Sequence, residues 1–258
     1  MADEKIRLGG MALANGVLVH GPKAWACAIR TDEGELKVAS ARKRFRAAEI
    51  ERPLLRGPAR LLEAIAIIPE VRRALPDAKL PFQRPAVLAS MLASATVVKL
   101  ARESGRLRPA AQELLAGVLS VAPAALALRS SDLAAYHGAE HISIGSYEHG
   151  EQRAKEHERC GSHLLGPLLA TTALANTLAA KAPPHLRPAA RVTAQLGALA
   201  ASTEIFGWMV RNPEKRLARA LAKPGHELQH RLATAEPTPA QVEVAETALA
   251  ACLALETA

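Results

Sequence analysis

The sequence predicts a mainly α-helical protein with a small antiparallel β unit towards its N-terminal end. Hydrophobic residues make up 49% of the 258 residues but aromatic residues only 3%, so the interior has to be aliphatic. The aliphatic residues are largely Ala and Leu, which are the strongest helix formers. Runs that favour strands occur early in the chain, separated by turn-forming residues. A chain of this length forms one large domain or two small ones.

The β unit is predicted for residues 9–46. Residues 11–19 are apolar and favour a strand, which the His-Gly-Pro-Lys sequence at 20–23 ends. Residues 24–30 and 36–41 enclose an Asp-Glu-Gly turn, the pattern of a β-hairpin. The basic run that follows is expected to be a solvated face, with a lipid- or nucleic-acid-binding patch as the alternative.

A first helix is predicted to begin at Gly57, because apolar residues recur at helical spacing from there. Pro69 should kink or end this helix, since proline cannot continue the helical hydrogen bonds. Residues 76–85 contain three prolines and should form a connector.

Four further stretches rich in Ala, Leu and Val follow, at 86–101, 110–128, 164–180 and 192–210. Each is near the length of about 20 residues that a helix needs to cross a bilayer. Each also contains polar or charged residues, and Ala contributes little transfer energy. The composition therefore leaves open whether the helical bundle crosses a membrane four times or packs as a soluble core.

Glu204 is the most conspicuous polar residue in these stretches. A carboxylate needs a partner both in lipid and in a protein core. Arg191 or Arg211 would supply an ion pair, and a place in a functional site is the alternative.

The C-terminal part is expected to be soluble in character. Asn212 precedes a basic helix that should run to Leu221 and be broken at Pro224. Thr238 is a good N-cap for a last helix, with Gln241 in the third helical position. Three segments are thus predicted: residues 1–56 form the β unit, 57–210 the helical core that contains the motif region 131–163, and 211–258 the C-terminal helices.

Three cysteines occur in the chain, which is too few and too irregular for a disulfide framework and indicates a reducing compartment. Cys27 is expected to be buried in a strand, and Cys252 to pack on one face of the last helix. The first residues lack the apolar region of a cleavable signal peptide.

The net charge of +8 is compatible with nucleic acid, an anionic membrane surface, or the cytoplasmic loops of a membrane protein as the partner. The scarcity of aromatic residues argues against a surface for single-stranded nucleic acid. If the four stretches span a membrane, both ends of the chain and residues 129–163 would face the cytoplasm, and the protein would lie in the cytoplasmic membrane. The alternative location is the cytoplasm itself.

The residues that carry chemistry are concentrated around His137-x-x-Glu140-His141. On a helix, His137 and His141 share a face and could bind one metal ion. Glu140 lies beside that face, where a general base or a further ligand would stand. The short pattern alone also occurs by chance in solvated helices.

More potential ligands follow within one short region: Glu148, His149, His157, Cys160 and His163. A Cys or a third His would complete a zinc-like set of nitrogen and sulfur donors, and His157 and Cys160 are the candidates. Glu148 could join the site as a second catalytic carboxylate. A polar loop that faces solvent is the alternative interpretation of this cluster.

Short motifs spread along the chain are shared with one bacterial family. They are Gly9-Gly10, His20-Gly21-Pro22, Pro53 with Arg56-Gly57, His137-Gly138-Ala139-Glu140-His141 with Tyr147-Glu148, His157-x-Arg159-Cys160-Gly161, and Pro224-Gly225 with Leu228-Gln229. On these motifs the chain resembles the YqhQ-like family, the bacterial domain of unknown function 1385, from about residue 9 to 255. Four positions depart from the family pattern: Asn15, His20, Glu158 and His163.

The resemblance implies an integral membrane protein and a metal-dependent enzyme without an established reaction. Its motifs carry over the candidate residues His137, Glu140, His141, Glu148, His157 and Cys160. The leading hypothesis is a hydrolase that uses a divalent metal ion, expected to be zinc. The second is a non-catalytic membrane scaffold with a structural zinc or hydrogen-bonded cluster. The third is a soluble, basic adaptor that binds RNA through residues 42–60 and 211–231.

Overall fold

The computed structural model describes residues 5–128 and 132–258 of the chain. Its strands are β1 (Gly9–Leu13), β2 (Gly16–His20), β3 (Ala24–Arg30) and β4 (Leu36–Arg42). They form one antiparallel sheet in sequence order, with Leu18 opposite both Met11 and Cys27. The sheet therefore grows by successive hairpins, as the early strand-forming runs predicted.

The region predicted as one strand at 11–19 is in fact two strands, and that part of the prediction was wrong. Asn15 makes the turn between them: its side-chain amide nitrogen donates to the carbonyls of Arg30 and Asp77, at 3.1 and 3.0 Å. Its amide oxygen accepts from the Lys79 backbone nitrogen at 2.9 Å. A buried asparagine that satisfies backbone groups stabilises a turn inside an otherwise apolar run.

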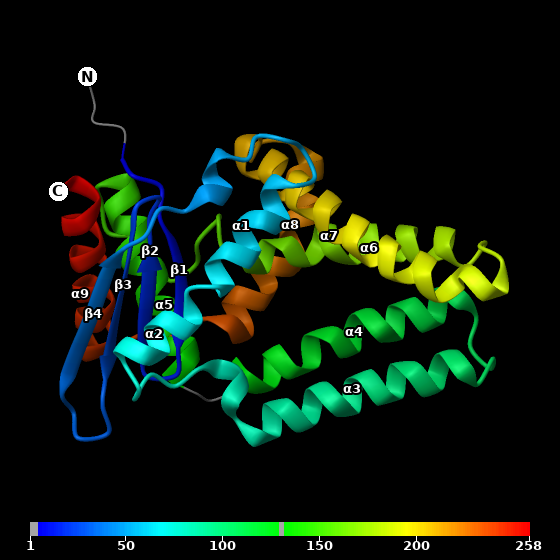
Figure 1. The fold of residues 1–258 in the computed structure, drawn as a ribbon, viewed down its shortest axis with the longest axis horizontal. Helices are drawn as coiled ribbons and strands as arrows, with labels where there is room; N and C mark the ends of the chain where they lie inside the picture. Colours follow the sequence, from blue (N-terminus) through cyan, green and yellow to red (C-terminus); the bar gives the residue numbers. More distant parts are fainter. Residues whose placement is uncertain (1–4, 129–131) are drawn as a thin grey trace.

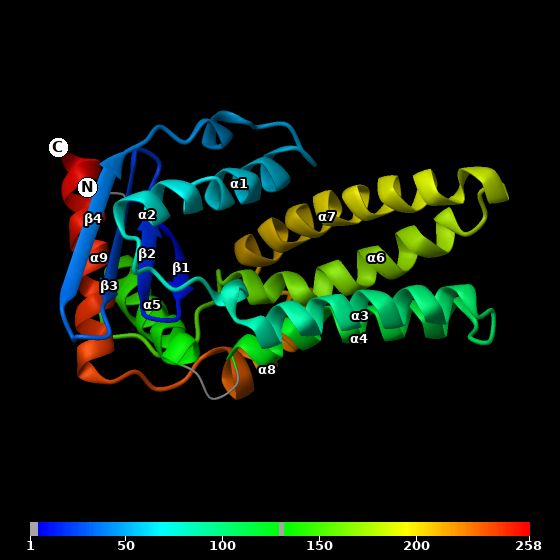
Figure 2. The ribbon, with the colours of Figure 1, turned by 60° about the horizontal axis from the view of Figure 1, so that its bottom comes forward.

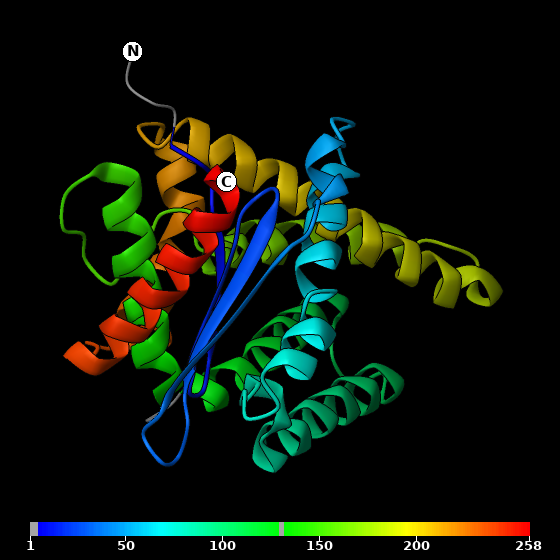
Figure 3. The same ribbon diagram turned by 60° about the vertical axis from the view of Figure 1, so that its left-hand side comes forward.

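Helices cover both faces of the sheet (Figure 3). The helices α5 (Asp132–His149) and α9 (Pro239–Thr257) pack on one face, against Val17, Val19 and Ala26. The helix α2 (Ile68–Ala74) packs on the other, where Trp25 and Cys27 are buried. Because side chains alternate across a strand, neighbouring residues serve the two layers. The core between the sheet, α5 and α9 joins residues from all three predicted segments.

The remaining helices and short turns are α1 (Arg56–Ile65), α3 (Pro85–Glu103), α4 (Pro109–Leu128), α6 (Leu165–Ala179), α7 (Arg187–Arg211), α8 (Arg216–Leu228), the 3₁₀ turns η1 (Arg46–Glu49), η2 (Pro81–Gln83), η3 (Gly161–Leu164) and η4 (Pro184–Leu186), and the π turn η5 (Gln229–Ala233). The predicted break near Pro69 is confirmed, because α1 ends at Ile65 and Pro69 lies in the first turn of α2. The predicted cap of α9 is also confirmed, with Thr238 and Gln241 forming a capping box.

Two helical hairpins project in the same direction away from the sheet (Figures 1 and 2). One is α3 with α4 and the other is α6 with α7, and we call the four helices together the arm. These helices correspond to the four long apolar stretches of the sequence. Each hairpin begins and ends beside the sheet-containing body, so its tip lies at the end of the arm that is furthest from the body (Figure 1).

Most of the large apolar side chains that remain exposed lie on the arm. Leu92 of α3 is 71% exposed and Leu196 of α7 is 64% exposed. In the four strands of the sheet, by contrast, Val38 is the large apolar residue that is exposed.

Among the described residues, α3 is the one helix that is long and apolar enough to cross a membrane by itself. Leu115–Leu128 qualifies only as a pair with α5, at an angle of 91°. Residues 129–131, with the predicted start of the motif region at 131, lie outside the described residues.

Two details of the helices were predicted wrongly. Glu204 makes the structural ion pair that was one of the two expectations, but its hydrogen-bonded partner is Arg56 of α1, through Nε and Nη2, and not Arg191 or Arg211. It also accepts a hydrogen bond from the backbone nitrogen of Leu54, at 3.1 Å. Leu54 has a positive φ of 67°. The carboxylate therefore anchors the start of α1 to the arm.

The second correction concerns α8, which continues through Pro224 instead of ending there. A Cβ on Gly225 would lie 2.5 Å from the carbonyl oxygen of Ser162, so the helix packs closely on the segment that follows Cys160. This packing outweighs the local cost of proline, and α8 gives way to the wider π turn only at Gln229.

Candidate metal centre

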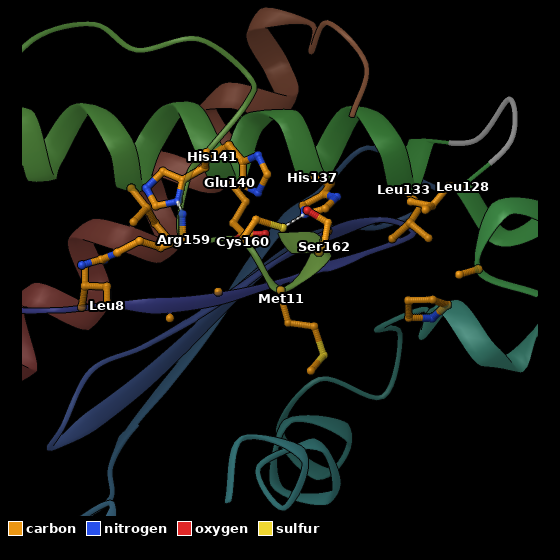
Figure 4. Close-up of a pocket in the computed structure, with 18 of the residues that line it drawn as sticks. Leu8, Met11, Leu128, Leu133, His137, Glu140, His141, Arg159, Cys160 and Ser162 are labelled. Atoms are coloured by element: carbon orange, nitrogen blue, oxygen red, sulfur yellow. Dashed lines mark hydrogen bonds between the residues drawn. The ribbon is translucent and has the colours of Figure 1, made fainter. Parts of the chain in front are cut away.

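One face of α5 lines a cavity of about 480 Å³ between this helix, β1 and the base of α4. His137, Glu140 and His141 project from α5 into it, and Cys160 approaches from the loop that follows the helix (Figure 4). Helical spacing brings the first three together, as the sequence predicted. The cavity therefore contains most of the candidate residues of the motif region.

Three potential ligand atoms converge in this cavity. His137, His141 and Cys160 each offer one donor atom, and these atoms all lie within 4.8 Å of one another. Cys160 Sγ is 3.4 Å from His137 Nε2. The His137 and His141 rings lie 4.3 Å apart, centroid to centroid. Among the described residues, no second group of three or more His, Cys, Asp or Glu side chains has its potential ligand atoms this close together.

Backbone carbonyls fix the orientation of both imidazoles. His137 Nδ1 lies 2.8 Å from the carbonyl oxygen of Ala233, and His141 Nδ1 lies 2.6 Å from that of Lys155. A carbonyl only accepts, so each Nδ1 carries a proton, and in the neutral imidazole the lone pair is then on Nε2. Metal-binding histidines are held in the same way by hydrogen bonds behind the ring.

The donor set fits a tetrahedral zinc ion. With Zn–N near 2.0 Å and Zn–S near 2.3 Å, a tetrahedral N–S separation is roughly 3.5 Å. The 3.4 Å between His137 Nε2 and Cys160 Sγ agrees with that value. Two imidazoles and a thiolate are also a chemically typical zinc set.

The His141 imidazole and the Cys160 thiol are both uncharged before a cation binds. Burial lowers the pKa of His141 to about 3, with the neighbouring His137 adding to the effect, so its imidazole is neutral as a ligand must be. Burial also raises the pKa of the Cys160 thiol above its ordinary value. The thiol would therefore release a proton when it binds a cation.

Glu140 is buried beside the three donors. Burial raises the pKa of Glu140 to about 7, although the nearby His137 partly opposes the shift. Its carboxylate lies against β1, where a Cβ on Gly10 would come within 2.2 Å of Glu140 Oε1. The Gly9-Gly10 motif of the sequence thus makes room for this side chain.

A second network, made of Glu148, His157 and Arg159, lies beside the three donors, and its His157 and Arg159 also line the cavity. His157 Nε2 lies 3.2 Å from Glu148 Oε2, and the other Glu148 oxygen accepts from the Arg159 guanidinium. The Arg159 backbone nitrogen donates to His157 Nδ1 at 3.3 Å. Both His157 nitrogens are thereby engaged, and His157 lies outside the group of three donors. Glu148 does not line the cavity, so here it orients His157 and Arg159.

Sequence reasoning missed the role of Gln229. This fully buried side chain accepts from the His157 backbone nitrogen at 2.9 Å and donates to the His157 carbonyl at 3.1 Å. Its amide nitrogen also donates to Ser162 Oγ at 2.6 Å and lies 3.1 Å from His163 Nδ1. Gln229 thus clamps the loop that presents Cys160. Its place in the Leu228-Gln229 motif was the signal available in the sequence.

The remaining candidates lie elsewhere. His149 Nδ1 contacts the Gly145 carbonyl at 2.9 Å, and Glu158 lies 3.4 Å from its other nitrogen. Asn15 forms the turn of the sheet, and His20 stacks on Phe45 at 5.1 Å. Two of the family departures are therefore structural residues outside the cavity.

Comparison with known proteins gives one result. The model of a family described as a protein of unknown function, DUF1385, matches residues 118–255. Searches of curated proteins and of solved structures found no match. The matched region covers more than half of the chain and includes the three donors, Glu140, Gln229 and most of α9. The chain belongs to the DUF1385 family.

Proposed function

We propose that the chain is a metal-dependent hydrolase whose centre lies in the cavity between α5, β1 and the base of α4. The observation that carries the proposal is the convergence of His137, His141 and Cys160 with both imidazoles fixed by backbone carbonyls. The position of these donors on the wall of a cavity, and not in a closed core, favours catalysis over a structural role.

His137 Nε2, His141 Nε2 and Cys160 Sγ would hold the ion. A divalent cation there supplies Lewis acidity, which activates water and polarises a carbonyl group. Glu140 lines the same cavity and would accept the proton from the attacking water as general base. His157 and Glu148 would act beside the site, by holding the loop of Cys160.

Metal analysis tests the binding part of this proposal. Protein reconstituted with zinc and dialysed should retain about one equivalent, and His137→Ala or Cys160→Ala should retain less than a tenth. His149→Ala is the matched control, because His149 lies on the same helix outside the donor group. Equal zinc in the wild type and the His137 variant would refute the centre.

A structural zinc site is the second candidate, because Glu140 lines the same cavity and would close the coordination as a fourth protein ligand if its carboxylate moved towards the three donors. Glu140→Gln separates the two functions. A hydrolase should keep its zinc and lose activity by roughly 10²–10⁴-fold, measured on a panel of ester and amide substrates. A structural site should instead lose zinc and unfold at lower temperature.

We place the protein at the bacterial cytoplasmic membrane, with the arm in the bilayer and the body, including both ends of the chain, on the cytoplasmic side. The exposed leucines of α3, α6 and α7 support this location. So does the parallel projection of both hairpins from the same side of the body (Figure 2). A peripheral helical arm in a cytoplasmic protein is the alternative.

A further inference from the structure

The candidate metal centre lies beside an edge of the sheet. The strand order is β1-β2-β3-β4, so β1 pairs with another strand on one side only. The consecutive residues 8–12 line the cavity that contains the donors. Met11 points away from α5 (Figure 4), whereas a Cβ on Gly10 would meet Glu140 of α5. Because neighbouring residues from opposite faces of the sheet line one cavity, the cavity lies alongside the strand, at its unpaired edge.

The register of β1 shows which backbone groups point to this edge. Leu13 lies opposite Gly16 across a two-residue turn, and the two residues form a hydrogen-bonded pair. Such pairs alternate along an antiparallel ladder, so Gly10 and Ala12 direct their N–H and C=O groups away from β2. Ala14, next in this series, donates outwards to a carbonyl of the connector that follows α2, at 2.9 Å. We call the backbone groups of Gly10 and Ala12 the β1 edge.

The β1 edge has no partner outside the sheet within the part of the chain that the structure describes. Gly10 is exposed, so the edge can be reached from solvent, and Ala12 is 9% exposed. Unpaired groups on an edge strand are a template for a further strand. The β1 edge therefore offers two donors and two acceptors, at the spacing of about 7 Å that an extended chain repeats.

The walls of the cavity indicate which side chains such a segment would carry. The lining is largely apolar and includes Leu133 and Ile144 of α5 and the base of α4. Arg159 also lines the cavity, but its guanidinium donates to Glu148. The volume of about 480 Å³ lies within the roughly 300–1,000 Å³ of ligand sites. The cavity thus fits a short extended segment with apolar side chains.

We propose that the β1 edge binds an extended polypeptide segment, and that peptide bonds between apolar residues are the substrate of the hydrolase proposed above, on which this inference rests. Main-chain pairing with an edge strand is a common way to bind extended peptides. A segment paired with Gly10 lies next to Glu140, because these two residues are in contact. A small apolar ester would leave the β1 edge unpaired, and the walls formed by α4 and the Cys160 loop keep out a second sheet.

The reaction consumes one water for each peptide bond. The oxygen of the water bonds to the carbonyl carbon, and Glu140 accepts one of its protons. The C–N bond then breaks, and Glu140 returns this proton to the leaving amine nitrogen. The products are a carboxylic acid and an amine.

Binding of short peptides to the full-length protein tests the β1 edge, and it is measured without zinc so that it does not depend on the candidate metal centre. The probes are dye-labelled peptides with apolar central residues and a lysine at each end. The same peptides with N-methylated backbones keep their side chains but lose their N–H donors. We expect fluorescence anisotropy to show that the N-methylated peptides bind about tenfold more weakly, because they cannot pair with a strand.

Ala12→Pro removes the outward N–H from the protein side, at an edge position that tolerates proline. It should weaken peptide binding by about tenfold and leave the zinc content unchanged. Ser40→Pro is the matched control, because Ser40 is exposed on β4, the other edge strand, and its N–H also faces outwards by the same alternation. It should leave binding unchanged. Circular dichroism melting verifies that both variants are folded.

Three binding results would overturn the proposal. Equal binding of the N-methylated peptides would show that side chains alone are bound. Equal losses in the two proline variants would show that the effect is not specific to β1. A dimer that Ala12→Pro converts to a monomer would show that a second copy of the chain pairs with β1.

Cleavage by the zinc-loaded protein separates this proposal from the hydrolase itself. Mass spectrometry should show peptides cut between their apolar residues, and Glu140→Gln should bind the peptides but leave them intact. Peptides that stay intact while esters are hydrolysed would refute the peptide as substrate and leave the hydrolase standing. Peptides that bind the β1 edge, with zinc retained but no substrate of any class hydrolysed, would refute the hydrolase and leave the edge as a peptide-binding site.

Discussion

At the scale of single residues, the candidate metal centre needs space as well as potential ligands. Gly10 lies directly against Glu140, and any side chain there would displace the carboxylate. We expect Gly10→Ala to lower the free energy of unfolding by about 1–3 kcal/mol, the usual cost of overpacking a core. Chemical unfolding monitored by circular dichroism measures this change.

Gly197→Ala provides the comparison for Gly10. A Cβ at Gly197 meets no atom within 4 Å, and the residue lies within helix α7. Alanine there should be neutral or stabilise by up to about 1 kcal/mol. If the two substitutions had equal effects, the contact between β1 and Glu140 would not exist in solution.

The three cysteines should differ sharply in reactivity. Cys27 and Cys252 are fully buried, and burial raises the pKa of their thiols to about 12 and about 11. Cys160 is half-buried and lines the cavity. Because the thiolate is the reactive form, iodoacetamide should label native protein at Cys160 alone, slowly, and zinc should slow it further.

Peptide mapping by mass spectrometry identifies the labelled residues, and protein unfolded in denaturant should be labelled at all three. Labelling of Cys27 in the native state would contradict the packing of the sheet. Unchanged labelling of Cys160 at saturating zinc would show that the ion does not bind its sulfur.

The donors could be found from the sequence, but their supports could not. The i, i+4 spacing of His137 and His141 is a property of any helix, so the pair was predictable. The hydrogen bonds behind the rings go to the carbonyls of Lys155 and Ala233. Every residue carries a backbone carbonyl, so the sequence does not show which carbonyls accept these hydrogen bonds. His157 and Glu148 had suitable chemistry for a site, and only the structure showed that they bind each other.

At the scale of elements, the π turn η5 supports the candidate metal centre. Its first residue, Gln229, holds the loop of Cys160, and its last residue, Ala233, accepts from His137. One distorted turn therefore orients two of the three candidate ligands. Such π turns occur frequently at functional sites. The sequence indicated a break at Pro224 instead, because packing between α8 and the segment after Cys160 is a long-range contact.

We expect Gln229→Leu to lower the free energy of unfolding by about 1–3 kcal/mol, since it leaves buried partners unpaired. Zinc affinity should also fall, by roughly 10–100-fold, as for other substitutions behind metal ligands. Competition with a chromogenic chelator measures the affinity. Gln152→Leu, at an exposed position of the preceding loop, should change neither quantity, and a Gln229 variant with unaltered zinc affinity would assign the turn a purely structural role.

At the scale of the whole molecule, the body and the arm bury apolar surface in different ways. The body covers its sheet on both faces and buries the apolar residues of the sheet, although α1 and α8 keep exposed leucines. The arm leaves many of its own exposed. The helices of the arm were predictable from their composition, whereas the packing of α9 against the N-terminal sheet was not. That contact joins the two ends of the chain, and no local pattern records it.

The exposed face of α3 provides the test of where the arm resides. Leu92 is 71% exposed near the middle of this helix. If α3 crosses a bilayer, Leu92→Asp places a charge in the hydrocarbon core, at a cost of roughly 2.5–3.5 kcal/mol. We then expect the wild type to stay in the membrane fraction after a wash with high salt, and the variant to be depleted from it.

Val38→Asp is the control, because Val38 is 43% exposed on the sheet of the body. This substitution should leave the distribution between membrane and soluble fractions unchanged. Release of the wild type by salt alone would show that the arm lies outside the bilayer, because salt screens charges at a surface but does not extract spanning helices.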